Sequence, residues 1–533
     1  MYDNFVKYCL THGATIYSLE VPKEMFDDVH VALCNPSIFI DNNRIRLVVR
    51  NVNYALWSSD DQYKFTSPYG PLCYITEWND NCLRTRNFLG EITENGFEYK
   101  PIDMSNFDVE PIWEFIGLED ARLVRWDGKL YITGVRRDTN TEGQGRMELS
   151  EITEDGVEIS RVRIKAPGND DTYCEKNWMP ILDMPYHYMR WVNPLQIVKV
   201  DPETGDTTIV VDKVNSDELP YLNYNDMQMR GSSQVVNVGD YHVAITHLCE
   251  LWFNEKNQKS SAGYWEQILV WDKDWNLIKA TEPLKFGNIG IEFTNGMAYQ
   301  DGVYYIPFAL QDNMAFLLTV NEDVINNFVI NDDRELGSYI LNDNIFLEFF
   351  DNPTDSYKCE NLGDYYFNKG YYAAAVVCYE RASEYNTYIS KDDLYVGLFK
   401  CGLALSQLPN PEIHEMGLWL RMIELLPNRS EGYLMMAKYC FWRDRFDESR
   451  IYAKLAYNKN NYKIDIPDYI HKLDTDIILI KSLYFSEDYL DCENMVNDLL
   501  EIEDKNLLPR QRFEINNFII QINNNKANKY RVL

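Results

Sequence analysis

The chain has few of the residues that metal sites and disulfide frameworks require. Its 533 residues include seven histidines and eleven cysteines, and no two cysteines form a Cys-x-x-Cys pair. An odd number of widely spaced cysteines is typical of reduced thiols. The histidines are scattered as well, so the sequence predicts neither a disulfide-stapled fold nor a zinc site.

Long apolar runs and basic charge are also scarce. No stretch of about 18 apolar residues occurs, and the first residues lack the basic and apolar regions of a secretion signal. We therefore expect a soluble, cytoplasmic protein that does not enter a membrane. Lysine and arginine number 51 against 83 acidic residues, a formal net charge of -32. This charge disfavours binding to nucleic acid unless the basic residues gather in one place.

Residues 1–350 are expected to form one all-β domain. From about 25 to 350, short apolar strands alternate with Asp-Gly, Asn-Gly, Gly-Asp or Asn-Asn turns, and no helix is predicted there. Repeated hairpins favour a β-propeller, because each blade is a small meander and a ring protects the sheet edges. A pair of packed sandwiches is the alternative. The predicted hairpins join 37–40 to 44–50, 121–126 to 130–135, 234–238 to 241–247, 268–271 to 277–280, and 296–299 to 303–310.

Near residue 351 the pattern becomes helical. Leu362, Gly363, Ala375, Tyr379 and Ala382 follow the spacing of a 34-residue tetratricopeptide repeat. Residues 397–405 and 433–456 are weaker copies, and 473–500 is a further helical stretch. We expect a tetratricopeptide-like solenoid over 355–525, which packs structurally, self-associates or binds a protein partner, and a frayed tail at 526–533.

The motif Glu119-Asp120-Ala121-Arg122 stands directly before a predicted hairpin and is the strongest functional signal. In a regular strand, Asp120 and Arg122 would point to the same side and Glu119 to the other. A carboxylic acid beside a fixed cation suits proton transfer on a substrate that carries an anionic group. A surface ion pair is the alternative.

Basic residues gather in or beside the other motifs of a chain that is otherwise acidic. Arginine holds phosphate oxygens with its planar fork, so the set predicts a phosphate-bearing substrate. For each single residue, a surface salt bridge is the alternative. The set comprises Arg50, Arg122, Arg136, Arg137, Lys176, Arg190 and Arg230.

Three further places bear on chemistry. His247 ends a predicted strand and is a candidate sugar or phosphate contact, or else a structural histidine. Glu292 stands between apolar neighbours, which would raise its pKa or merely mark a strand edge. The segment 169–171, Asn-Asp-Asp, resembles a metal clamp only superficially, because no βαβ unit or glycine-rich phosphate loop surrounds it. We expect no required metal and no cofactor.

Four collinear motifs together resemble those of a known family. They are Asn35-Pro36-Ser37 before a strand that ends at Arg50, Glu119-Asp120-Ala121-Arg122, Glu175-Lys176-Asn177-Trp178-Met179-Pro180, and Phe308-Ala309-Leu310-Gln311-Asp312. This half of the chain resembles the five-bladed propeller family of inverting β-mannoside phosphorylases and related nucleotide-sugar-using mannosyltransferases. That family usually has Glu-Asp-Pro-Arg and a closing Tyr-Gly-x-x-Asp. The departures, Ala121 and the lost Tyr-Gly, bear on donor or acceptor contacts.

The resemblance implies a five-bladed catalytic propeller that transfers a sugar, mannose by analogy, from a nucleotide-sugar donor to a glycan or other acceptor. Asp120 would be the acid/base, with Glu119, Glu175 and Glu292 as the other candidate carboxylates. The attached helical repeats look like the modular arrangement of bacterial or viral glycosyltransferases. Together with the residues singled out above, the candidate substrate or phosphate contacts are Asn35, Arg50, Arg122, Arg136, Arg137, Lys176, Asn177, Arg230, His247, Glu292 and Asp312.

Three alternatives stay open at this point. The first is an inverting β-mannoside phosphorylase that uses inorganic phosphate. The second is a non-catalytic sugar-binding scaffold. The third concerns the acceptor, which could be sugar-modified viral DNA, although the net charge disfavours a nucleic acid.

Overall fold

The computed structural model describes residues 2–26, 32–57, 73–75, 82–169, 172, 174–214, 227–253, 259–330, 344–409, 412–459, 461, 472–501, 513, 515–521 and 524. The chain divides into two units. Unit 1 comprises Met1–Arg381 with Gln407–Asn410, and unit 2 comprises Ala382–Ser406 with Pro411–Leu533. Each unit is described by itself.

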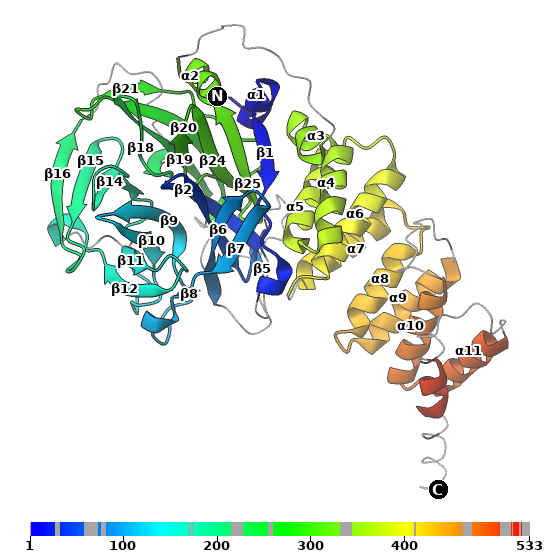
Figure 1. The fold of residues 1–533 in the computed structure, drawn as a ribbon. Helices are drawn as coiled ribbons and strands as arrows, with labels where there is room; N and C mark the ends of the chain where they lie inside the picture. Colours follow the sequence, from blue (N-terminus) through cyan, green and yellow to red (C-terminus); the bar gives the residue numbers. More distant parts are fainter. Residues whose placement is uncertain are drawn as a thin grey trace. The chain divides into compact units, whose positions relative to one another are not determined.

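The β region of unit 1 is a β-propeller, as the hairpin pattern predicts, and it has the five blades that the family resemblance implies. Five sheets of four or five strands follow one another along the described residues, and neighbouring strands within each blade are antiparallel (Figure 1). The blades are β2 (Ala32–Asp41), β3 (Arg44–Val52), β6 (Leu83–Thr93) and β7 (Gly96–Pro101); β9 (Glu119–Trp126), β10 (Lys129–Arg136), β11 (Arg146–Ile152) and β12 (Glu158–Arg163); β13 (Met179–Pro180), β14 (His187–Trp191), β15 (Leu195–Val200) and β16 (Thr207–Lys213); β17 (Gln228–Gly231), β18 (Val236–Val238), β19 (Tyr241–Phe253), β20 (Lys259–Trp271) and β21 (Leu277–Ala280); and β22 (Glu292–Phe293), β23 (Ala298–Gln300), β24 (Val303–Leu310) and β25 (Met314–Asn321) with β1 (Thr15–Ser18).

The fifth blade combines the two ends of the β region. Strand β1 pairs antiparallel with β25, and Thr15 lies opposite Thr319 (Figure 1). This pairing joins the first strand of the chain to the last blade. The ring is therefore closed by backbone hydrogen bonds, which leaves β25 paired on both sides. Outside the blades, β8 (Phe115–Ile116) pairs with β6, and β4 (Ala55–Trp57) with β5 (Cys73–Ile75).

The tight turns that the sequence predicts are confirmed. In three hairpins the two turn residues both have positive φ, as a two-residue turn that matches the strand twist requires. Asparagine, aspartate and glycine adopt this conformation at the least steric cost. The pairs are Asn42 with Asn43, Asp127 with Gly128, and Asp301 with Gly302.

Polar side chains tie the blades together across the middle of the propeller. The Ser37 hydroxyl of β2 donates to the Ala121 carbonyl of β9 at 2.7 Å. Gln234 donates to the Ile38 carbonyl at 2.9 Å, and Asn295 donates to the Ala121 carbonyl at 3.1 Å. All these side chains are buried. They satisfy backbone carbonyls that face no neighbouring strand at the inner edge of each blade.

Short helices interrupt the β region, so the expectation of no helix over 25–350 is wrong for α2 (Glu322–Ile330) and α3 (Ile345–Asp351). Helix α2 carries Glu322 and Asp323 in its first turn, where the helix dipole favours negative charge. Helix α3 begins at an Asn344 cap and buries three phenylalanines. Such short apolar segments cannot be told from strands by their periodicity. A further short helix, α1 (Phe5–Thr11), precedes β1.

The first predicted repeat forms a helical hairpin, α4 (Ser356–Lys369) and α5 (Tyr372–Tyr385). Leu362 and Ala375 are fully buried. A Cβ atom on Gly363 would lie 2.6 Å from the Tyr379 ring, so the glycine is what allows the two helices to approach. The leucine-glycine and aromatic spacing thus encodes a close helix pair.

This hairpin packs within unit 1. The Tyr366 hydroxyl lies 3.1 Å from the Ser18 hydroxyl of β1, and the Tyr371 hydroxyl donates to the Val21 carbonyl at 2.9 Å. Arg381 donates to the Asn288 carbonyl at 3.0 Å. The division between the units therefore falls at Arg381 rather than near residue 350.

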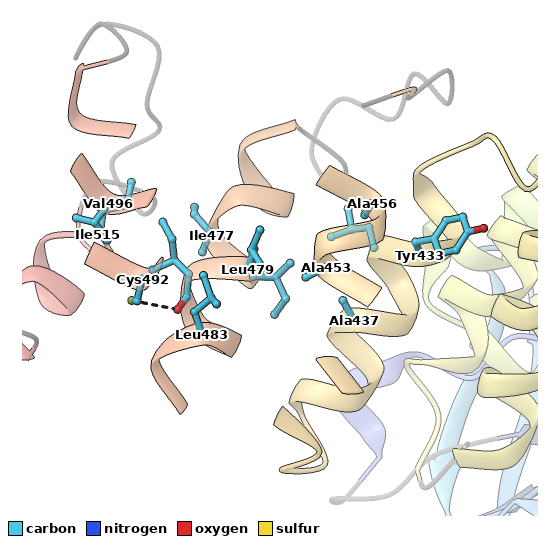
Figure 2. Packing of buried hydrophobic residues seen from close by; sticks show 13 residues of the cluster. Tyr433, Ala437, Ala453, Ala456, Ile477, Leu479, Leu483, Cys492, Val496 and Ile515 are labelled. Carbon is cyan, nitrogen blue, oxygen red and sulfur yellow. Dashed lines mark hydrogen bonds between the residues drawn. The ribbon is translucent and has the colours of Figure 1, made fainter. Parts of the chain in front are cut away.

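Unit 2 consists of further antiparallel helices, which confirms the helical prediction for 397–405, 433–456 and 473–500. Its buried cluster includes Ala437, Ala453, Leu479 and Cys492, which come from four different helices (Figure 2). Among the described helices of the chain, none has both the length and the apolar character needed to cross a bilayer. The helices of unit 2 are α6 (Lys391–Leu405), α7 (Glu412–Leu425), α8 (Glu431–Phe441), α9 (Phe446–Lys459), α10 (Lys472–Phe485) and α11 (Tyr489–Glu501).

Candidate functional site

Asp120 of β9 lies in a buried polar site shared with the first blade. Asn35 Nδ2 donates to Asp120 Oδ1 at 2.9 Å, and Arg50 Nη1 donates to the same oxygen at 3.0 Å. Arg50 is itself fixed, because its Nε donates to Thr85 Oγ1 at 3.1 Å and its Nη2 to the Tyr54 hydroxyl at 3.0 Å. The carboxylate is thus held by one cation whose orientation is set by two further side chains.

Four of the candidate site residues share a left-handed backbone conformation. Asn35, Asp120, Asn177 and Asp312 have φ values of 41°, 52°, 63° and 52°. This left-handed region is costly for most residues, and asparagine and aspartate tolerate it best. At each of these four positions the backbone therefore departs from regular extended geometry.

The regular alternation on which the prediction for Asp120 and Arg122 rests is therefore interrupted. The register between β9 and β10 shifts between Thr133 and Val135, which leaves one extra residue in β9. Arg122 donates to the backbone carbonyl of Asp120 at 2.9 Å, and its Nε donates to the Ser232 carbonyl at 2.9 Å. Its side chain is fully buried. Burial lowers the pKa of this guanidinium to about 10, although the Asp120 charge acts in the opposite direction.

Two carboxyl groups with opposite pKa shifts lie in the site. Burial alone would raise the pKa of Asp120, but Arg50, Lys176 and the Asn35 hydrogen bond outweigh it, so this pKa lies below its ordinary value. Burial raises the pKa of Asp312 to about 6, and the Asp120 charge adds to that effect against Arg50 and Lys176. Asp120 is therefore ionised at neutral pH, and Asp312 gains a proton in mildly acidic solution.

Two other blades supply cations that act on the charges of this site. Lys176 and Asn177 precede β13, and Arg230 lies in β17. The Lys176 and Arg230 side chains are partly exposed, whereas Asn177 is buried. Lys176 is close enough to lower the pKa of Asp120, and Arg230 and Lys176 together act on His247. The Asn177 Oδ1 atom is buried and has no hydrogen-bond partner among the described residues.

His247 of β19 is buried beside this group. Its Nδ1 lies 2.8 Å from Ser232 Oγ, and its ring stacks on Tyr264 with centroids 5.1 Å apart. Burial and the neighbouring Arg230 and Lys176 charges lower its pKa well below the usual range. The imidazole is therefore neutral at physiological pH.

Ser232 and Glu266 are members of this site that the sequence did not single out for chemistry. Glu266 of β20 is the cross-strand partner of His247. Its Oε2 lies 3.3 Å from Ser232 Oγ, and its Oε1 accepts the Thr294 N–H at 3.2 Å. Burial raises the pKa of this carboxyl well above its ordinary value. The sequence offered little signal for Glu266, which stands two residues before the predicted strand 268–271. The strand register that sets it opposite His247 was not predictable.

Other predicted contacts have different surroundings. Arg136 lies in a buried ion-pair network, with its Nε 2.8 Å from Glu148 Oε2 and its Nη1 3.3 Å from Asp138 Oδ2. Arg137 Nη2 lies 3.3 Å from Cys174 Sγ, and its guanidinium lies over the Phe115 ring. These partners place both arginines outside the set of charges that act most strongly on Asp120.

The other candidate carboxylates differ in role. Glu292 accepts the backbone N–H groups of Phe286, Gly287 and Ile289, the last at 2.6 Å, so it organises a loop. Glu175 is paired with Arg190, whose Nε lies 3.0 Å from its Oε2. Glu119 is partly buried next to Asp120 in β9.

No group of three or more histidine, cysteine, aspartate or glutamate side chains able to hold a metal ion occurs in the part of the chain that the structure describes. Asp170 and Asp171 of the superficial metal-clamp motif lie outside the described residues. The expectation that no metal or cofactor is required stays a prediction.

No family model and no curated protein matches this sequence. Among solved structures, a β-1,2-mannobiose phosphorylase from Listeria innocua is 13% identical, with 60% of this chain and 100% of that chain covered and a TM-score of 0.39. A GDP-Man-dependent mannosyltransferase from Leishmania mexicana is 14% identical over 56% of this chain and 91% of that one, with a TM-score of 0.32. The pilF protein of Pseudomonas aeruginosa is 14% identical over 33% of this chain and 71% of that one, with a TM-score of 0.27. Because these TM-scores lie below 0.5, the fold assignment rests on the strand order, and the function on the site.

Proposed function

We propose that the protein is an inverting glycosyltransferase that moves a sugar from a nucleotide-diphosphate donor to a glycan hydroxyl, with Asp120 as the general base. The observation that carries this proposal is the ionised Asp120 carboxylate, fixed by Arg50 and Asn35 and surrounded by further cations. The four sequence motifs support it, since Asn35, Arg50, Asp120, Lys176 and Asp312 come from all four and gather in one site. Mannose as the sugar rests on the resemblance of those motifs alone.

The proposed reaction is a single displacement. Asp120 takes the proton from the acceptor hydroxyl while that oxygen attacks the anomeric carbon, and the bond from the anomeric carbon to the diphosphate oxygen breaks. The electron pair leaves with the diphosphate. Lys176, Arg230 and the neutral His247 would bind the negative charge that develops there. No covalent sugar-enzyme intermediate is needed, so the configuration inverts.

Asp312 would hold a sugar hydroxyl in this scheme. Its pKa of about 6 means that the group exchanges a proton close to neutral pH and can either donate or accept a hydrogen bond. Two carboxyl groups whose surroundings push their pKa values apart are well suited to different tasks in one site. In this scheme Asp120, which has the lower pKa, serves as the base, and Asp312, which has the higher pKa, positions the sugar.

An inverting phosphorylase is the second candidate, because the same cations would bind inorganic phosphate. Cleavage of a mannoside, however, needs a protonated acid at the glycosidic oxygen. The low pKa of Asp120 in the free protein favours the base role, and hence synthesis from a phosphorylated donor. A non-catalytic scaffold would not need an ionised carboxylate at this position.

Ligand-induced thermal stabilisation distinguishes the transferase, the phosphorylase and the scaffold. Nucleotide sugars with guanine and uracil bases are compared with inorganic phosphate and simple mannosides, since a ligand at 100 times its dissociation constant stabilises by about 2.7 kcal/mol. A shift with one nucleotide sugar, followed by release of its nucleotide diphosphate in the presence of an acceptor glycan, supports the transferase. A shift with phosphate and mannoside alone selects the phosphorylase, and no turnover with any of them selects the scaffold.

A further inference from the structure

Ser232 Oγ stands between two other buried side chains. It lies 2.8 Å from His247 Nδ1 and 3.3 Å from Glu266 Oε2. Ser232 is fully buried, and the other two side chains are about 1% exposed. A hydroxyl has a single hydrogen to donate, so one of its two neighbours must donate to Ser232 while the other accepts from it.

Two arrangements satisfy both contacts. If Glu266 is ionised, Ser232 donates to Glu266 and the Nδ1–H of His247 donates to Ser232, which leaves a bare lone pair on Nε2. If Glu266 carries a proton, its hydroxyl donates to Ser232, Ser232 donates to the lone pair of Nδ1, and the ring proton sits on Nε2. The protonation of Glu266 therefore decides whether Nε2 is an acceptor or a donor.

The surroundings of Glu266 favour the protonated form. Its hydrogen-bond partners are the neutral Ser232 hydroxyl and the Thr294 N–H, and the charged group that acts on it is another carboxylate, Glu292. A buried carboxylate without a cation beside it is costly, and it takes up a proton instead. His247 is neutral too, so the three side chains together carry no charge.

We propose that Glu266 is a positioning residue that acts as a neutral carboxylic acid, donates to Ser232 and thereby fixes His247 as the Nε2–H tautomer. Nε2 lies across the ring from the Ser232 contact. The charged groups that act on the ring are Arg230, Lys176, Asp120 and Arg122. The fixed Nε2–H then donates to an anionic phosphate oxygen of the substrate. This part of the inference rests on the proposed function, whereas the tautomer does not.

The two carboxyl oxygens of Glu266 have different partners, Thr294 and Ser232, and the Glu266 variants are chosen to keep or remove these contacts. In Glu266→Gln the amide oxygen can still accept the Thr294 N–H, and the amide NH₂ can still donate to Ser232, so the direction of the chain is kept. Glu266→Leu removes both. Ser232→Ala removes only the relay hydroxyl, because Arg122 contacts the Ser232 backbone carbonyl and not its side chain. Ser233→Ala is the matched control, since the buried Ser233 hydroxyl likewise makes two hydrogen bonds. It donates to the Gln234 carbonyl and accepts the Ile245 N–H, and it contacts neither His247 nor Glu266.

The deciding experiment is ¹⁵N NMR of the full chain with labelled histidine, in which His247→Gln assigns the His247 signals among seven histidines. We expect a protonated Nε2 and a bare Nδ1 in the wild type, in Glu266→Gln and in Ser233→Ala. In Ser232→Ala, and in Glu266→Leu where it folds, we expect a mixture of the two tautomers. An Nδ1–H tautomer or an imidazolium in the wild type would overturn the proposal, as would a tautomer in Ser232→Ala that is unchanged.

Calorimetric titration with inorganic phosphate and with GDP provides the second readout. We expect Ser232→Ala to bind the better of these two probes about tenfold more weakly, the loss of about one hydrogen bond of 1.4 kcal/mol, and Glu266→Gln to restore what Glu266→Leu loses. Equal affinity in wild type and Ser232→Ala overturns the proposed hydrogen bond from His247 Nε2–H to a phosphate oxygen of the substrate. If the wild type binds neither probe, the proposed function fails, and the NMR result still decides the tautomer.

Discussion

At the scale of single residues, Asp120 and Asp312 show how one polar site gives two identical side chains opposite acidities. Both are buried enough for desolvation to raise their pKa values. Asp120 receives direct hydrogen bonds from Arg50 and Asn35. Burial raises the pKa of Asp312, and the negative charge of Asp120 raises it further. The first pKa falls and the second rises, which is the separation that acid–base chemistry needs.

Asp120→Asn is expected to lower turnover at least about 100-fold, the usual contribution of a general base. Donor affinity should change little, because the amide oxygen can still accept the hydrogen bonds of Asn35 and Arg50. Single-turnover kinetics and donor titration check this on the same preparation. If Glu119→Gln loses turnover and Asp120→Asn does not, the role of base belongs to Glu119.

Asp312→Asn is expected to stabilise the protein at neutral pH. The native pKa of about 6 lies above the ordinary 3.8, so the native state binds more protons than the unfolded state between these values. Its stability therefore falls as pH rises from about 4 to 6. The asparagine variant lacks this loss. Its free energy of unfolding should therefore rise relative to that of the wild type by up to about 3 kcal/mol as pH increases from about 4 to 6. Thermal unfolding at pH 4.5 and pH 7.5 measures it, and an advantage that shrinks with rising pH would contradict it.

At the scale of elements, Arg122 connects two blades. It comes from β9 and donates to the backbone of Ser232, 110 residues further along the chain. Arg122→Met is expected to destabilise the protein by about 2–4 kcal/mol, because buried carbonyls lose their donor. Chemical unfolding provides the measurement. If Arg122 instead binds substrate phosphate, as the sequence suggested, donor affinity would fall by about 1–3 kcal/mol with little change in stability.

Two glycines of unit 2 provide a matched pair. A Cβ atom on Gly402 of α6 would lie 2.2 Å from the Trp419 ring, whereas one on Gly417 of α7 meets nothing within 4 Å. We expect Gly402→Ala to destabilise unit 2 by about 1–3 kcal/mol through overpacking. Gly417→Ala should stabilise it by about 0.5–1 kcal/mol, because glycine is a poor helix former. Opposite signs in thermal unfolding confirm the helix packing, and equal effects contradict it.

The local elements could be predicted from the sequence and the long-range contacts could not. The Asp127-Gly128 and Asp301-Gly302 turns need residues that tolerate positive φ, so the sequence itself marks them. The partners of Arg122, and the pairing of His247 with Glu266, depend on strand register and on blades far apart in the chain. The motif marked Asp120 as a candidate, but it did not predict the left-handed backbone of Asp120 or its contact with Arg50.

At the scale of the whole molecule, the α4–α5 hairpin belongs to the folding unit of the propeller. Tyr365 and Lys369 of α4 both contact Glu20, at 2.7 and 2.6 Å, and Tyr371 contacts Val21. We expect a fragment of residues 1–388 to unfold in one cooperative transition. A fragment of residues 1–352 should unfold at least several degrees lower, because it exposes apolar surface between β1 and the helices. Calorimetry of both fragments checks this, and equal transition temperatures would contradict it.

The pairing of β1 with β25 also imposes an order on synthesis. Thr15 finds its partner Thr319 only after the ribosome has added 304 more residues. At roughly 5–20 residues per second this takes about 15–60 s. During that time β1 is an unpaired strand and the four earlier blades form an open arc. We therefore expect the growing chain to be most prone to aggregation before the fifth blade emerges, because the edge of β1 is then unpaired.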